Sequence, residues 1–291
     1  ILSITLTVSV VLTAKGMDSL AINPLDTQKT DSLSDSLIPD TLKCSTGESY
    51  DKAIRDIPNP SFGVGEELNF SINWGFVHVG SARMSVKPLV NKNKRPCYEL
   101  EATARSNKTI SNIYHVNDLF LSYLDTAALI PHEYLKYQNE GSYHFDQHAI
   151  FDQKLNTVKV WGKRTKKNSV INKDTSFAIP QMVYDVISAF YYTRVLDLKK
   201  RDIFVLNNID NDKLTKIQVR VLDYDKINVG AGTFKCLIVE PQMSGIGLFK
   251  KKGRLLIWLT NDKYKMPVMF KSKIFIGSIS GKLESFKRVK D

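Results

Sequence analysis

The sequence predicts a mainly β protein, a single curved antiparallel sheet or half-barrel wrapped on one central α-helix at about residues 180–198. Three observations support this prediction. Residues 68–74 alternate apolar and polar side chains, as a half-buried strand does. Gly75 and Gly80 then interrupt the pattern, as glycines do where a strand bends or bulges. Short strand-like segments follow one another across short polar turns, and one helical segment stands between them.

The first 58 residues have a different composition from the rest of the chain. Residues 1–14 are apolar and uncharged, about as long as the apolar region of a signal peptide and shorter than the roughly 20 residues of a spanning helix. We expect residues 1–21 to be a secretory signal peptide clipped at its start; the alternative is a buried N-terminal strand. Residues 22–58 are polar and predict a leader or tether. The chain is therefore expected to be exported, to the periplasm or the outer membrane, with its folded domain at 59–291.

Strand candidates begin after Pro58 and Pro60. Alternation and β-branched or aromatic composition mark residues 98–105, 117–124, 133–139, 142–151 and 155–161. Residues 139–141 and 152–156 have the composition of hairpin turns. This succession is typical of an antiparallel meander.

One helix is expected next. Pro180 suits a first helical turn, where its missing N–H costs little. Apolar side chains recur every three to four residues from Met182 to Val195, which predicts a stripe that packs against the sheet. Asp185 lies early and Arg194 late, and both positions favour the helix dipole.

Strand composition resumes after this helix. The further candidates are residues 203–207, 214–225, 234–241, 254–260, 268–275 and 278–287, with a glycine-bearing turn at 229–233. Strands, one helix and more strands fit one β domain better than a parallel α/β fold.

The chain is basic and has few cysteines. It has 41 Lys and Arg against 30 Asp and Glu, a formal net charge of +11, which favours anionic surfaces. Two basic tips would either contact anionic headgroups or be solvated turns; they hold Lys163, Arg164, Lys250, Lys251, Lys252 and Arg254. Aromatic residues do not alternate with these charges, so no nucleic-acid partner is expected. Nothing in the sequence specifies a Cys97–Cys236 disulfide, although one would suit an exported chain.

Four sequence blocks resemble a known family. The first is a "VGE-x-L…W-G…G" strand, here Val64–Leu68 with Trp74, Gly75 and Gly80, and the second is a helix, here Asp185–Arg194. The third is a "G-x-F" hairpin, here Gly232–Phe234. The fourth is a closing "W-L-T-x-D…P-V" segment, here Ile257–Asp262 with Pro267 and Val268. Over residues 62–287 the chain resembles the DUF3108 family, exported bacterial proteins of unknown function. The resemblance implies an envelope protein built as a half-barrel that holds a helix. It supplies no catalytic residues.

The most metal-like cluster is His144, Asp146 and His148. On a strand their side chains share one face, but the two histidines would lie about 13 Å apart, too far to share an ion. An exposed polar strand face is therefore favoured over a metal site. No cofactor motif is present, and no nucleophile has a base and an orienting group beside it in a recognised pattern.

Six aromatic residues are candidates for a ligand site inside a curved sheet: Trp74, Phe76, Tyr137, Tyr143, Trp161 and Trp258. In a filled barrel they would form the core, and in an open one they would line a cavity. The function expected is non-enzymatic, binding an apolar or amphiphilic ligand or docking on an envelope protein. The alternatives are a hydrolase of envelope glycan or lipid that uses Asp146 or Glu140 as acid or base, and a purely structural interaction module. The oligomeric state is not specified by the sequence.

Overall fold

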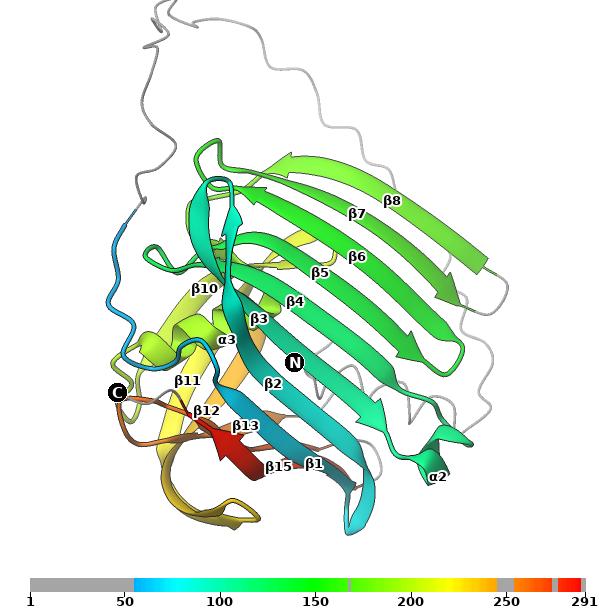
Figure 1. Cartoon of the computed structure of the whole chain (residues 1–291), viewed down its shortest axis with the longest axis vertical. Helices are drawn as coiled ribbons and strands as arrows, with labels where there is room; N and C mark the ends of the chain where they lie inside the picture. Colours follow the sequence, from blue (N-terminus) through cyan, green and yellow to red (C-terminus); the bar gives the residue numbers. More distant parts are fainter. Residues whose placement is uncertain (1–54, 167–168, 245–253, 274–276, 289–291) are drawn as a thin grey trace, which may run out of the picture.

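The computed structural model describes residues 55–166, 169–244, 254–273 and 277–288, and strands dominate these ranges (Figure 1). Two helices are present there, α2 (Lys108–Ser111) and α3 (Val186–Val195). The strands are β1 (Glu67–Trp74), β2 (Val77–Lys92), β3 (Arg95–Ser106), β4 (Asn117–Asp125), β5 (Pro131–Glu140), β6 (Tyr143–Asp152), β7 (Thr157–Lys166), β8 (Ser169–Ala178), β9 (Val183–Tyr184), β10 (Ile203–Asp210), β11 (Lys213–Val229), β12 (Gly232–Ser244), β13 (Leu255–Thr260), β14 (Pro267–Lys273) and β15 (Ser278–Lys287). The prediction of a mainly β chain is confirmed.

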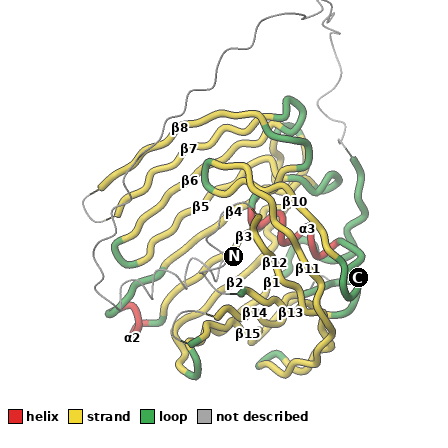
Figure 2. Tube along the Cα trace, turned by 180° about the vertical axis from the view of Figure 1, so that it is seen from behind, coloured by secondary structure: helices red, strands yellow, loops and turns green. Residues whose placement is uncertain are grey.

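All of these strands belong to one sheet, in the order β8-β7-β6-β5-β4-β3-β2-β1-β15-β14-β13-β12-β11-β10-β9. Neighbours are antiparallel, except that β9 pairs with β10 in parallel. Two meanders therefore meet where β1 pairs with β15, and Figure 2 shows the sheet curving from one meander into the other. Antiparallel hairpins need only short turns, which explains why the strands follow one another so closely in the sequence.

The alternation predicted for β1 is present. Leu68, Phe70 and Ile72 are buried on the face of the sheet that packs on α3, here called the inner face. Gly80 lies where the register of β1 and β2 shifts, and a Cβ there would be 2.2 Å from the carbonyl oxygen of Arg105. Gly75 has a φ of +59° in the turn between β1 and β2. The two glycines thus serve close strand contact and turn geometry, respectively.

The prediction of a helix over residues 180–198 is wrong at both ends. Pro180 precedes the helix, and Val183 and Tyr184 form β9. The helix begins after Asp185, whose carboxylate accepts hydrogen bonds from the N–H groups of Ile187 (2.8 Å) and Ser188 (3.0 Å). This cap satisfies N–H groups of the first helical turn, and so the helix begins after Asp185 and not at Pro180.

The predicted single stripe is also too simple, because α3 packs on more than one side. Ile187 and Tyr191 join a core group with residues of β3, β4, β6 and β7, whereas Ala189 joins a group with residues of β10 to β13. Met182, the expected first member of the stripe, lies outside the helix and is exposed.

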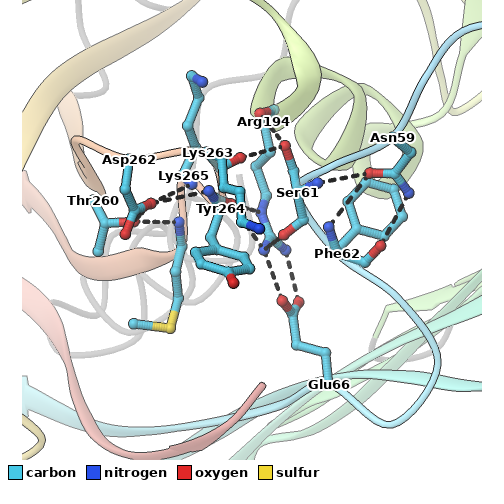
Figure 3. Close-up of polar contacts among 11 residues, drawn as sticks. Asn59, Ser61, Phe62, Glu66, Arg194, Thr260, Asp262, Lys263, Tyr264 and Lys265 are labelled. Atoms are coloured by element: carbon cyan, nitrogen blue, oxygen red, sulfur yellow. Dashed lines mark hydrogen bonds and ion pairs between the residues drawn. The ribbon is translucent and has the colours of Figure 1, made fainter. Parts of the chain in front are cut away.

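A buried ion pair holds the C-terminal end of α3. Arg194 is fully buried and donates two hydrogen bonds of 2.7 Å to the Glu66 carboxylate (Figure 3). The same guanidinium donates to the carbonyl oxygens of Ser61 and Tyr264. Full hydrogen bonding is what makes a buried charge tolerable. The pair fixes α3 relative to β1 and to the segment before β14.

Candidate functional site

An apolar cavity of about 100 Å³ lies between α3 and the inner face of the sheet. Val186, Ala189 and Phe190 of α3 form one wall, and Phe70 and Val239 belong to the opposing strands. No charged side chain lines it. Apolar cavities of roughly 150 Å³ stay dry and take up small apolar molecules, so this cavity suits apolar rather than polar contents.

The outer face of the sheet brings together several residues singled out in the sequence. Tyr137, His144, Asp146 and Lys163 line one pocket of about 440 Å³. The strand register explains the grouping, because Tyr137 pairs with Asp146 and Asp146 pairs with Lys163. An exposed aromatic ring, a carboxylate and an ammonium group therefore meet on β5, β6 and β7.

The third residue of the metal-like cluster is engaged elsewhere. His148 is 2.6 Å from the Glu133 carboxylate, and its ring lies 5.2 Å from that of Trp161. Within the ranges that the structure describes, no three His, Cys, Asp or Glu residues are placed to hold a metal ion.

None of the six aromatic candidates lines the apolar cavity. Trp74 and Phe76 are exposed at the β1–β2 turn, while Trp258 is buried and donates a 2.9 Å hydrogen bond to Asp225. Tyr143 and Trp161 are half-buried. The aromatic residues of the cavity are instead Phe70, Phe190 and Phe270, two of which stood in segments predicted to pack in the core. A ligand role for the six stays a prediction.

The basic tips are only partly described. Lys163 is exposed on the outer face, whereas the Arg164 guanidinium lies 4.7 Å from the centre of the Phe145 ring. Arg254 forms an ion pair with Glu240. Lys250, Lys251 and Lys252 lie outside the described residues.

Two buried carboxyl groups lie on the inner face, away from the cavity. Asp118 accepts a 3.0 Å hydrogen bond from the N–H of Asn139, and Gln138 donates to Glu140 over 3.4 Å. Burial, and then the charge of Glu140, raises the pKa of Asp118 to about 8. Asp118 therefore keeps its proton to a higher pH than an ordinary aspartic acid does. The sequence analysis named Glu140 as a candidate acid or base but missed Asp118. The pairing of β4 with β5 brings the two carboxyl groups together, and no local sequence pattern shows this.

The two cysteines that the structure describes do not form the disulfide considered above. Cys97 on β3 and Cys236 on β12 are both free and buried. Burial raises the pKa of each thiol to about 12. Neither has the low pKa of a nucleophilic cysteine.

The fold and the cavity define a class: mainly β proteins with one long antiparallel sheet and an apolar cavity beside a single longer helix. The family model described as "Protein of unknown function (DUF3108)" matches residues 69–284, most of the chain. The chain belongs to this family, as its four sequence blocks predicted. No curated protein matches the chain. In the described part of the chain, no helix has the length and apolar character needed to cross a bilayer.

Two solved structures are similar to the chain. One is a beta-barrel-like protein of the domain of unknown function DUF1849 from Brucella abortus, with 9% identity and a TM-score of 0.49; the match covers 79% of this chain and 100% of that one. The other is a protein with a YmcC-like fold from Bacteroides fragilis, with 12% identity and a TM-score of 0.28, covering 80% of this chain and 99% of that one.

Proposed function

We propose that this chain is an exported, non-enzymatic envelope protein that holds an apolar molecule, or the acyl part of an amphiphile, between α3 and the sheet. The observation that carries the proposal is the uncharged cavity of about 100 Å³. Interiors normally pack without voids larger than a water molecule, so a cavity beside the helix needs an explanation. A bound apolar group would supply the missing contacts.

The overall arrangement proposed for this function is a half-barrel wrapped on α3. Its support is that α3 contributes side chains to two core groups from different parts of the sheet. Export is proposed from the apolar run at residues 1–14 and the polar segment behind it. An exported setting is one where apolar molecules need carriers.

The experiment combines ligand detection with a variant that fills the cavity. Native mass spectrometry of the purified protein should find a co-purified apolar molecule, and an apolar fluorescent probe should bind saturably. Ala189→Leu places a larger side chain into the cavity from α3 and should weaken probe binding by about tenfold or more while leaving stability unchanged or higher.

Ala149→Leu is the matched control. Ala149 is fully buried on β6 and does not line the cavity. Overpacking there should cost about 1–3 kcal/mol and leave probe binding intact. If the parent binds no apolar probe, or if Ala189→Leu destabilises as much as Ala149→Leu, the cavity is a packing feature and the proposal fails.

A second candidate function is a hydrolase of envelope glycan or lipid. The specific feature is the raised pKa of Asp118 beside Glu140, since a carboxyl that keeps its proton near pH 7 is the form needed for general acid catalysis. Release of soluble products from envelope glycan or lipid, lost in Asp118→Asn, would favour this candidate over the carrier.

A further inference from the structure

Four large apolar side chains are exposed together at one end of the sheet. The exposed fractions are 37% for Trp74, 107% for Phe76 and 57% for Val77 in the β1–β2 turn, and 83% for Ile113 after α2. We call these four residues the apolar tip. Single exposed apolar residues are ordinary, but a group of them marks a surface that is covered by something.

The two segments that form the tip are held against each other. The Asn107 N–H donates to the carbonyl oxygen of Val79 over 3.0 Å, and its side-chain amide donates to that of His78 over 2.8 Å. Trp74 and Ile113 also line one apolar hollow of about 120 Å³. The β1–β2 turn and α2 both lie along the lower edge of Figure 1. The tip is therefore one surface built from two segments that are joined by hydrogen bonds.

The surroundings of the tip are basic. Residues 73–80 and 107–115 contain no Asp or Glu, and they carry the exposed Lys108. Lys273 is exposed nearby, since it pairs with Ser278, whose carbonyl oxygen accepts a hydrogen bond from Gly75. An apolar centre with cations around it is complementary to an anionic lipid surface.

We propose that the apolar tip inserts into the headgroup region of an anionic phospholipid bilayer and docks the protein there. Trp74 and Phe76 supply the aromatic rings that favour this interface, and Ile113 adds apolar area. Lys108 and Lys273 can keep their ammonium groups among the headgroups while their methylene stems follow the apolar chains. This surface does not depend on the cavity beside α3 or on its contents.

The test uses the purified chain and sedimentation with vesicles. The chain should bind vesicles of phosphatidylcholine mixed with phosphatidylglycerol, and this binding should weaken as the salt concentration increases. The double variant Phe76→Ser/Ile113→Ser should lower the partition coefficient by at least about tenfold, because two exposed apolar groups no longer enter the bilayer. Its melting temperature should match the parent, since neither side chain is buried.

Leu155→Ser is the matched control. Leu155 is 70% exposed in the turn between β6 and β7. That turn lies at the opposite end of β6 from Gly141, whose N–H donates a hydrogen bond to the carbonyl oxygen of His115 beside the tip. Loss of the Leu155 side chain should leave the partition coefficient unchanged. Lys108→Glu/Lys273→Glu should weaken binding to the mixed vesicles and leave binding to pure phosphatidylcholine as it was.

Hydrogen exchange reports on the tip itself, even if another part of the chain also binds the membrane. With mixed vesicles, peptides covering residues 74–80 and 107–115 should gain protection, and the peptide covering residues 153–157 should not. Failure of the parent to bind, equal binding by parent and double variant, or unchanged exchange at the tip would overturn the proposal. A parent that self-associates through the tip, with a monomeric double variant, would instead assign the surface to a second copy of this chain.

Discussion

At the scale of single residues, the Glu66–Arg194 pair shows what a local pattern can and cannot predict. The position of Arg194 near the end of α3 was read from the sequence as favourable to the helix dipole. Its partner lies 128 residues away in the chain, so no local pattern could identify it. The pair joins two of the four sequence blocks on which the resemblance was based. Tyr264, which precedes Pro267 of the closing block, accepts a hydrogen bond from the same guanidinium.

Removing one partner of this pair should be costly. Arg194→Met leaves the Glu66 carboxylate buried without its counter-ion, and we expect a loss of about 3–5 kcal/mol of unfolding free energy. Urea denaturation measures it. Arg220→Met, at an exposed position on β11, should change stability by less than about 0.5 kcal/mol. A similar effect for both variants would mean that the pair contributes little.

The buried thiols give a second prediction at this scale. With pKa values of about 12, Cys97 and Cys236 hold almost no thiolate at pH 8, so iodoacetamide should leave both unmodified in the native protein. In denaturant, peptide mass spectrometry should find both alkylated. Rapid native labelling of either would show that its strand opens readily.

At the scale of elements, the sequence predicted strands better than the helix. Period-two alternation identifies the buried face of β1 because that face packs along the whole strand. The predicted start of the helix was wrong because β9 forms only when Val183 and Tyr184 pair with β10, a contact that local propensity does not contain. The helix stripe was misread because α3 is covered on more than one side.

The two glycines of the first hairpin should respond differently to substitution. Gly80→Ala brings a Cβ within 2.2 Å of the Arg105 carbonyl oxygen, so β2 and β3 must separate, and we expect a loss of more than about 2 kcal/mol. The Cβ of Gly75→Ala meets no neighbour within 4 Å. The substitution therefore costs only the strain of a positive φ, about 1 kcal/mol of unfolding free energy. The urea concentrations at the midpoints of unfolding give the ranking of the two variants. The reverse ranking would contradict the close contact at Gly80.

At the scale of the whole molecule, the site was harder to predict than the fold. The cavity combines side chains of α3 with residues of β1, β2 and β10–β14, and its shape depends on how two meanders meet. Sequence patterns placed Phe70 and Phe190 in the core but had no means of showing that a space remains between them. Of the six aromatic candidates, Trp74 and Phe76 fell at a turn and Tyr137 and Trp161 on the outer face, and none of the six lines the cavity.

Global stability should fall as the pH rises from about 5 to about 8. The pKa of Asp118 is about 8 in the folded chain and 3.8 ordinarily, so within this window the folded state holds a proton that the unfolded state has lost. The unfolding free energy should then fall by up to about 1.4 kcal/mol per pH unit. The pKa of buried Asp185 is also raised and acts in the same direction.

Denaturation of the parent and of Asp118→Asn at several pH values measures this dependence. The variant cannot ionise at this position, so the decline should become shallower. Equal slopes for the two proteins would show that Asp118 is ionised in the folded state.

The pairing of β1 with β15 has a consequence for biosynthesis. Among the strands that the structure describes, the ribosome makes β1 first and β15 last, so one edge of β1 lacks its partner strand until residues 278–287 have been translated. Each meander can form as it emerges, because its strands pair with their sequence neighbours. A premature stop before Ser278 would leave β1 and β14 with unpaired backbone N–H and C=O groups, the arrangement that recruits other chains into aggregates.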